Sequence, residues 1–180
     1  MNLNGRTALV TGSTQGIGLA IAEALARAGA QLVLHGIEPP EQGAAMAARL
    51  QAEHGPRAAY VQADLMQQAE AEGLVAAAEA LLAPIDILVN NAGIQFTCPI
   101  AEFPAARWNA ILAINLSSAF HSMKAALPGM RERGWGRIVN IASVHGLVAS
   151  VNKGAYLAAK HGLVGLSKGV ALETAAEGIT

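Results

Sequence analysis

Residues 6–28 of this 180-residue sequence read RTALVTGSTQGIGLAIAEALARA, and this stretch decides the fold class. Its first part, Arg6–Thr11, is a short apolar and β-branched run that predicts a buried strand. A glycine cluster follows, and from Gly16 to Ala28 apolar residues recur at steps of three and four, the period of a helix. Gly29 then predicts the end of that helix. A strand, a glycine-rich turn and a helix in this order indicate the first unit of a parallel α/β sheet.

The same alternation of strands and helices continues along the chain. Further strands are predicted at Gln31–Leu34, Ala58–Ala63, Ile85–Val89 and Arg137–Ala142. Further helices are predicted at Glu41–Glu53, Gln67–Ala83, Pro104–Arg133 and Ala155–Ala176. Solid apolar strands that alternate with helices form parallel sheets covered on both faces. We therefore expect an α/β fold of three layers, a doubly wound, Rossmann-like parallel sheet in the order 3-2-1-4-5. A sixth strand would begin where the sequence stops, so either another segment covers the apolar edge of strand five or this sequence is part of a longer protein.

Composition and charge exclude several classes of protein. Hydrophobic residues make up 53% of the chain, enough to bury a core and to exclude disorder. Twelve Lys and Arg against thirteen Asp and Glu give a net charge of −1, so a nucleic-acid partner is not expected. The single Cys98 cannot form a disulfide within the chain, which fits a reducing compartment. Neither a secretory signal nor a membrane span is predicted, so we expect a cytoplasmic protein with no membrane partner, and no metal site.

The turn after the first strand, Thr11–Gly18 (TGSTQGIG), has the composition of a phosphate-binding loop. Glycines there let the backbone approach a diphosphate at the positive end of a helix dipole. The spacing Gly-x-x-x-Gly-x-Gly differs from the Gly-x-Gly-x-x-Gly fingerprint. A tight turn in which the glycines serve packing alone is the other interpretation.

Two further segments lie at predicted strand ends that a dinucleotide would reach. Asp64 and Leu65 close strand three, where a carboxylate can accept a hydrogen bond from an adenine amino group, although an Asp there also caps helices. Residues 90–93 (NNAG) follow strand four, and their small side chains let a ribose approach, although turn chemistry also selects Asn and Gly.

Ser143, Tyr156 and Lys160 form a candidate acid/base constellation. Tyr156 and Lys160 are four residues apart and therefore share one helix face. An ammonium group next to a phenol stabilises the phenolate, so Tyr156 can exchange a proton with a hydroxyl or carbonyl oxygen. Ser143 follows strand five and can donate a hydrogen bond to the same oxygen. Taken alone, the Tyr–Lys pair is also typical of an amphipathic surface helix.

Together with Asn115, these motifs resemble the classical short-chain dehydrogenase/reductase family over the whole chain. The resemblance implies that Tyr156 is the catalytic acid/base, that Lys160 binds the nicotinamide ribose, that Ser143 orients the substrate oxygen and that Asn115 supports a proton-relay water. It also implies cofactor contacts, which we expect at Gly12, Thr14, Gln15, Gly16, Ile17, Gly18, Asp64, Leu65, Asn91, Ala92, Gly93, Tyr156 and Lys160.

Within that family, residues 91–95 (NAGIQ), 135–138 (WGRI) and 141–153 (IASVHGLVASVNK) resemble the bacterial 3-hydroxybutyrate dehydrogenase branch. This resemblance implies that Gln95, His145 and Lys153 hold the carboxylate of a small anionic hydroxy or keto acid beside Ser143 and Tyr156. Such donors suit a small anion. A solvated lysine and a packed histidine are the ordinary alternatives.

The end of strand two, residues 35–38 (HGIE), indicates the cofactor. It offers no Arg or Lys to pair with a 2′-phosphate, so NAD is expected. Glu38 lies 20 residues after Gly18 (38 − 18 = 20), near the usual place of an acidic residue on the ribose 2′-hydroxyl.

The resemblance also implies that this chain is shorter than its family. We therefore expect a single NAD-binding domain over residues 1–180, C-terminally incomplete and truncated before strands six and seven. The expected reaction is NAD-dependent interconversion of (R)-3-hydroxybutyrate and acetoacetate. The alternatives are an NADPH-dependent 3-oxoacyl thioester reductase and a catalytically inactive nucleotide-binding module. The family's four-helix interface implies a homo-oligomer.

Overall fold

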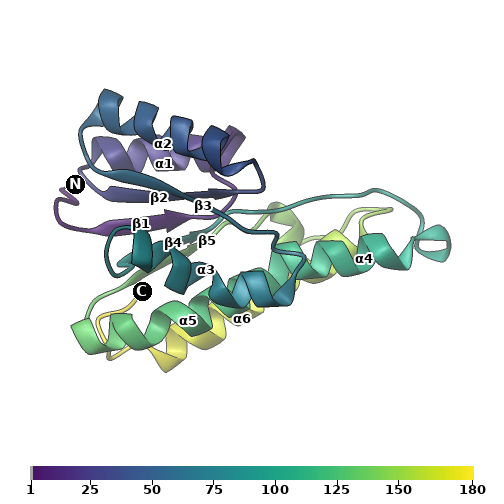
Figure 1. Ribbon diagram of the computed structural model, residues 1–180. Coiled ribbons are helices and arrows are strands. Elements are labelled where there is room, and N and C mark those ends of the chain that lie inside the picture. Colours follow the sequence, from purple (N-terminus) through teal and green to yellow (C-terminus); the bar gives the residue numbers. More distant parts are fainter. Residues whose placement is uncertain (1) are drawn as a thin grey trace.

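A computed structural model describes residues 2–180 and shows a parallel five-stranded sheet in the order β3-β2-β1-β4-β5 (Figure 1). The strands are β1 (Thr7–Val10), β2 (Gln31–Gly36), β3 (Ala58–Gln62), β4 (Ile87–Asn90) and β5 (Arg137–Asn140). The helices are α1 (Gly16–Arg27), α2 (Pro40–His54), α3 (Gln68–Leu81), α4 (Ala105–Leu112), α5 (Ser118–Arg133) and α6 (Gly154–Glu173). The predicted strand order is confirmed, and the predicted elements differ by a few residues at their ends, except for the helix Pro104–Arg133, which the structure divides.

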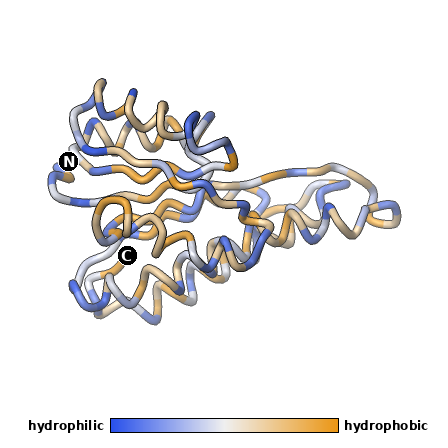
Figure 2. The backbone as a smooth tube through the Cα atoms, in the orientation of Figure 1, coloured by the Kyte–Doolittle hydropathy of each residue, from blue (hydrophilic) through white to orange (hydrophobic). Residues whose placement is uncertain are grey.

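Alternation along the strands divides the core into two layers. Leu9, Val33 and Leu88 pack with α3, α5 and α6 on one face of the sheet. On the other face, their neighbours Val10, Leu32 and similar residues pack with α1 and α2. Side chains in a strand point alternately to opposite faces, so an unbroken apolar strand fills both layers. Figures 1 and 2 show the result, apolar strands between two helical layers.

The predicted helix Pro104–Arg133 is continuous but not uniform. A π-helical turn, η2 (Ala113–Ser117), separates α4 from α5. Such a turn is a single wider loop of backbone within a helix and is frequent at functional sites. It lies where the long helix passes the carboxyl end of β4, and Asn115 is at its centre.

The last residues of the described chain cover the first half of the β5 edge, which is one of the two alternatives that the sequence left open. The Ile138 N–H donates to the Thr180 carbonyl (2.8 Å), and the Thr180 N–H donates to the Gly136 carbonyl (3.1 Å). Ile179 is buried beside this pairing. Gly178 allows the close approach, because a side chain at its positive φ of 72° would collide with the Gly134 carbonyl oxygen. The last two residues thus add a short parallel bridge to the sheet.

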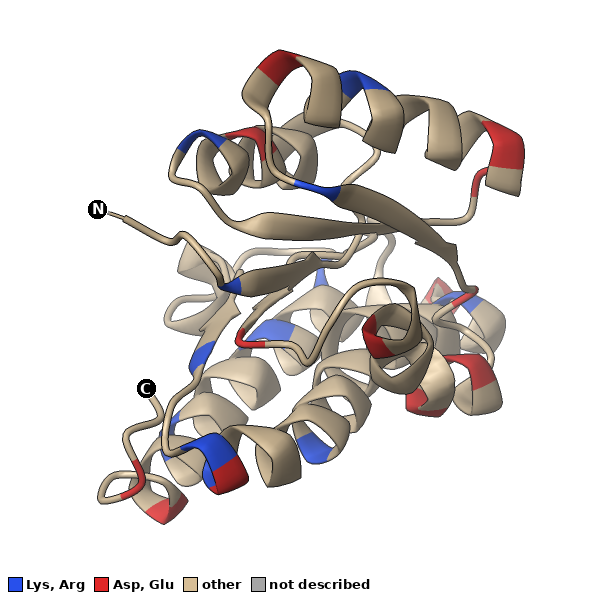
Figure 3. Ribbon diagram, turned by 60° about the vertical axis from the view of Figure 1, so that its left-hand side comes forward, with Lys and Arg blue, Asp and Glu red and all other residues tan. Residues whose placement is uncertain are grey.

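Charged side chains lie mainly on the helices and in the loops (Figure 3). Among residues 2–180, no helix has both the length and the apolar character needed to cross a membrane. In the same residues, His, Cys, Asp and Glu side chains nowhere gather in the groups of three that a metal ion would need.

Candidate active site and dinucleotide pocket

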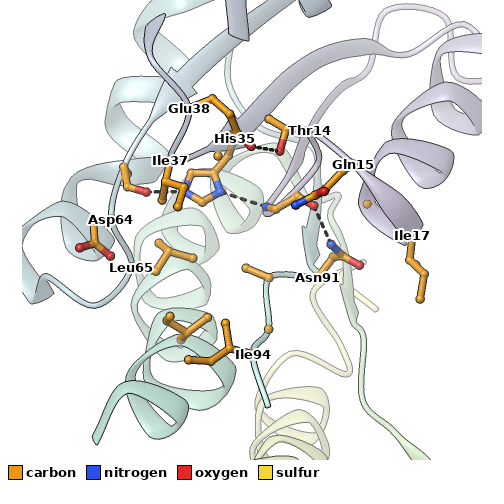
Figure 4. Close-up of a pocket in the computed structure, with 17 residues that line it drawn as sticks. Thr14, Gln15, Ile17, His35, Ile37, Glu38, Asp64, Leu65, Asn91 and Ile94 are labelled. Atoms are coloured by element: carbon orange, nitrogen blue, oxygen red, sulfur yellow. Dashed lines mark hydrogen bonds between the residues drawn. The ribbon is translucent and has the colours of Figure 1, made fainter. Parts of the chain in front are cut away.

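A cavity of about 410 Å³ opens where the carboxyl ends of β1, β2, β3 and β4 meet (Figure 4). Ten of the residues expected to contact a cofactor line it: Gly12, Thr14, Gln15, Ile17, Gly18, Asp64, Leu65, Asn91, Ala92 and Gly93. Three others, Gly16, Tyr156 and Lys160, lie outside its lining. The cavity therefore occupies the switch point of the doubly wound sheet, where ligands bind in open α/β folds.

The phosphate turn, residues 11–18, requires glycine for two different reasons. Gly12 has a positive φ of 60°, and an added Cβ would lie 3.1 Å from the Ala92 Cα. A Cβ at Gly18 would collide with the Gly12 carbonyl oxygen. Because α1 begins at Gly16, the N–H groups of its first turn have no intrahelical acceptor and face the end of the cavity. These N–H groups and the helix dipole suit an anionic group.

His35 is a pocket residue that the sequence prediction missed. Its Nδ1 accepts from the Gly12 N–H (3.0 Å), and its Nε2 lies 3.1 Å from the Ala63 carbonyl oxygen (Figure 4). Its side chain is buried, and burial lowers the pKa of His35 from 6.5 to about 4. The available signal was one imidazole at the end of an apolar strand, LVLHG, where a polar side chain needs partners.

Glu38 closes the cavity beside the phosphate turn. Its Oε1 accepts from the Thr14 hydroxyl (2.8 Å), whereas its Oε2 is buried without a hydrogen-bond partner among the described residues. Gly36 leaves room for this carboxylate, because a Cβ there would collide with Oε2. Glu38 therefore lines the pocket with one carboxylate oxygen bonded to Thr14 and the other packed against Gly36.

Asp64 lines the cavity and shapes the turn before α3. Its Oδ1 accepts from the Met66 N–H (2.9 Å), and its own N–H donates to Glu70 (2.7 Å). The alternative role of helix cap is wrong, since the N-cap of α3 is Gln67.

Asn91 ties the end of β4 to the phosphate turn. Its side-chain Nδ2 donates to the carbonyls of Thr11 (2.9 Å) and Gly12 (3.0 Å), and its N–H donates to the Thr11 hydroxyl (3.0 Å). Ala92 donates to the same hydroxyl (3.0 Å). The NNAG segment is therefore fixed against β1 as well as lining the cavity.

Asn115 joins the π-helical turn to the segment after β4. Its Oδ1 accepts from the Ile94 N–H (2.8 Å), and its Nδ2 donates to the Ile94 carbonyl (2.9 Å). The side chain is 2% exposed, so both polar atoms are buried and paired. The Asn115 amide therefore fixes the backbone of Ile94, a residue that lines the cavity.

A cluster of candidate catalytic side chains lies outside the cavity lining, near the end of β4. It consists of Ser143, Tyr156 and Lys160. Lys160 is 4% exposed and donates to the Ile141 carbonyl (2.7 Å), and its Nζ lies 5.7 Å from the centre of the Tyr156 ring. Burial lowers the pKa of Lys160. Ile141 in turn donates its N–H to the Asn90 carbonyl (2.9 Å), which links this cluster to the end of β4.

Ser143 and His145 complete the cluster. The Ser143 hydroxyl accepts from the His145 N–H (3.2 Å), and the His145 ring lies edge-on to the Tyr156 ring with centres 5.9 Å apart. The His145 Nε2 lies 2.7 Å from the Ser150 hydroxyl. The structure therefore brings three of the four expected catalytic side chains together with one expected substrate ligand.

Gln95 and Lys153 are placed differently. The exposed Gln95 side chain contacts the Thr97 hydroxyl (3.4 Å), and Lys153 stands at the N-cap of α6. Within residues 2–180, no hydrogen bond joins either side chain to Ser143 or Tyr156. Their assignment to a substrate carboxylate stays a prediction.

A partly buried chain of side-chain hydrogen bonds connects β4 and β5 to the helices that pack against them. Asn90 donates to the Asn140 Oδ1 (2.8 Å), and the Asn140 Nδ2 donates to the Ser167 hydroxyl (2.8 Å). Ser122 of α5 donates to the Asn90 Oδ1 (2.7 Å). This polar chain, Ser122–Asn90–Asn140–Ser167, connects β4 and β5 to α5 and α6.

Comparison with known proteins agrees with this architecture. Residues 6–180 match the family described as short chain dehydrogenase. The chain is 55% identical over 178 residues to D-beta-hydroxybutyrate dehydrogenase of Cupriavidus necator, covering 99% of this chain and 68% of the relative. It is 48% identical over 175 residues to the enzyme of the same name from Rhizobium meliloti, covering 97% and 68%.

A solved structure agrees with the fold. Gluconate 5-dehydrogenase of Burkholderia cenocepacia, in complex with NADP and tartrate, superposes with a TM-score of 0.92 at 38% identity. The alignment covers 99% of this chain and 69% of that one. From the sequence match and the shared fold, this chain belongs to the short-chain dehydrogenase family of oxidoreductases.

Proposed function

We propose that this chain interconverts (R)-3-hydroxybutyrate and acetoacetate, with NAD as the redox partner. The two relatives named D-beta-hydroxybutyrate dehydrogenase support the substrate class. The single observation that carries the chemistry is the cluster of Tyr156, Lys160, Ser143 and His145 beside the dinucleotide pocket.

Each side chain of the cluster has a separate role in the proposed reaction. In alcohol oxidation the Tyr156 oxygen takes the hydroxyl proton as the C–O bond gains double-bond character, and the C–H electron pair leaves as hydride. The nicotinamide, when bound, supplies the hydride acceptor that no side chain offers. Lys160 holds positive charge next to the phenol, and the Ser143 hydroxyl donates to the substrate oxygen. We assign His145 to the carboxylate of the anionic substrate, and its ring would exchange the contact with the Ser150 hydroxyl (2.7 Å) for one with that carboxylate.

The pocket residues fit a dinucleotide. Gly12 and Gly18 allow the tight turn before α1, whose first N–H groups have no intrahelical acceptor and can donate to a diphosphate. The Glu38 carboxylate lines the pocket, where a ribose hydroxyl can donate to it and where its charge would repel a 2′-phosphate. NAD is therefore favoured over NADP, the cofactor of the Burkholderia cenocepacia structure.

We further propose that residues 1–180 form one dinucleotide-binding domain that associates with copies of itself. The candidate surface is the outer side of α5 and α6, where Phe120 and Leu172 are exposed. Apolar side chains of this size on neighbouring helices are typical of protein interfaces.

The reaction is tested by mixing the chain with NAD⁺ and (R)-3-hydroxybutyrate and following NADH, with the (S) enantiomer as the matched substrate control. We expect turnover of the (R) form, and roughly a thousandfold loss in Tyr156→Phe with unchanged affinity for ADP-ribose. Full activity in Tyr156→Phe would refute the role of the phenol. Turnover of a 3-oxoacyl thioester with NADPH would support the thioester reductase, and binding of ADP-ribose without turnover of any of these substrates would support the inactive module.

A further inference from the structure

His35 occupies a junction between parts of the pocket that are distant in the sequence. It stands near the end of β2, 23 residues after Gly12 and 28 before Ala63, and its ring contacts both (35 − 12 = 23; 63 − 35 = 28). Gly12 belongs to the phosphate turn, and Ala63 directly precedes Asp64 and Leu65 on the adenine side. Figure 4 shows the imidazole between these two walls of the cavity.

The two contacts specify one form of the imidazole. A backbone N–H can only donate, so the Nδ1 that faces Gly12 carries no proton. A backbone carbonyl can only accept, so the Nε2 that faces Ala63 carries the proton. The ring is therefore neutral and in the Nε2–H tautomer. At 2% exposure it has no access to water that could replace either partner.

The backbone of His35 reinforces the same junction. Its N–H donates to the Ser13 hydroxyl (2.9 Å), and its carbonyl accepts from the Ser13 N–H (2.9 Å). The N–H groups of Gly12 and Ser13 are thus occupied within the protein. A bound diphosphate must then rely on donors further along the turn, and His35 sets the position of that turn.

We propose that His35 is a positioning residue for the dinucleotide, acting through a neutral Nε2–H imidazole that fixes the phosphate turn relative to the adenine side of the pocket. This inference rests on the proposed binding of a dinucleotide. Its consequence is specific: loss of the ring should weaken the adenosine diphosphate half of the cofactor without affecting the site around Tyr156.

The test measures binding of ADP-ribose to the 180-residue chain by calorimetry for His35→Leu and His35→Asn. His35→Leu removes both ring contacts, and we expect the Kd to rise roughly tenfold or more. His35→Asn keeps an acceptor for the Gly12 N–H, so its Kd should lie between those of His35→Leu and the unaltered chain. His161→Leu removes an exposed histidine of α6 and is the matched control, with unchanged Kd.

Two further measurements separate positioning from stability. Asp86→Asn weakens the opposite end of the sheet, where Asp86 pairs with Arg6, and should leave the ADP-ribose Kd unchanged in folded protein. Nitrogen NMR of the imidazole should show an unprotonated Nδ1 and a protonated Nε2, a readout that does not depend on whether His35→Leu folds.

The outcomes are distinguishable. ADP-ribose affinity unchanged in folded His35→Leu, or an Nδ1–H tautomer, would overturn the assignment of His35. Failure of the unaltered chain to bind ADP-ribose would overturn the proposed function itself, and with it this inference.

Discussion

Lowering the pH from 7 to 5 will test the burial of His35 through the free energy of unfolding. In the folded chain, burial lowers the pKa of His35 from 6.5 to about 4, so the unfolded chain binds the proton first as the pH falls. The imidazole therefore contributes stability above pH 6.5, and that contribution is lost as the pH falls toward 4. Linkage between these two pKa values gives a loss of about 2 kcal/mol between pH 7 and pH 5.

The assay is urea unfolding of the unaltered chain and of His35→Asn at both pH values. The remaining histidines and the carboxylates are common to both proteins, so the difference between the two pH dependences isolates His35. We expect the unaltered chain to lose about 2 kcal/mol more than His35→Asn. Equal losses in the two proteins would show that His35 is not held in a buried, neutral form.

Four other substitutions, one of them a control, test separate parts of the structure. Gly18→Ala should raise the Kd for ADP-ribose at least roughly tenfold, because its Cβ collides with the phosphate turn. Gly73→Ala changes an open position in α3, so it should leave this Kd unchanged and raise the free energy of unfolding by about 0.5–1 kcal/mol. An equal Kd in the two variants would contradict the crowding at Gly18. Glu38→Gln should raise kcat/KM with NADP relative to NAD, because it removes the charge that repels a 2′-phosphate, and an unchanged ratio would exclude Glu38 from cofactor choice. Asp86→Asn should lower the free energy of unfolding by about 2 kcal/mol, because the buried carboxylate accepts from Arg6 and from the Thr7 N–H. A free energy of unfolding in urea equal to that of the unaltered chain would contradict this.

Local periodicity was sufficient to predict the layers of the fold. An apolar strand followed by a glycine turn and an amphipathic helix has few alternatives, and the right-handed crossover then determines strand order. The π-helical turn at Asn115 could not be predicted in this way, since a single wider turn leaves the apolar spacing of the long helix almost unchanged. Pairing of Thr180 with β5 was not predicted either, because residues 178–180 (GIT) are too few to show the alternation of a strand.

In the candidate site too, local periodicity predicted some of the residues and not others. Tyr156 and Lys160 were predicted as a pair because helix geometry fixes residues four apart on one face, and the structure places them together. The loops that carry Gln95 and Lys153 have no such periodicity, so their side-chain directions could not be predicted. His35 was missed because a polar residue within an apolar strand does not indicate its partners, which come from the ends of β1 and β3.

The polar chain Ser122–Asn90–Asn140–Ser167 has a consequence for how the protein opens. If α6 moved away from the sheet by itself, the partly buried Asn140 amide would lose the Ser167 hydroxyl as its acceptor, and leaving a polar group without a partner is costly. Detachment of α6 is therefore coupled to β4, β5 and α5, and we expect these elements to exchange their amide hydrogens as one cooperative unit. The exposed segments 95–104 and 147–152 lie outside this polar chain, and the Cys98 N–H donates to the Asn152 carbonyl (2.9 Å), so we expect the two segments to move together while the helix that carries Tyr156 keeps its register.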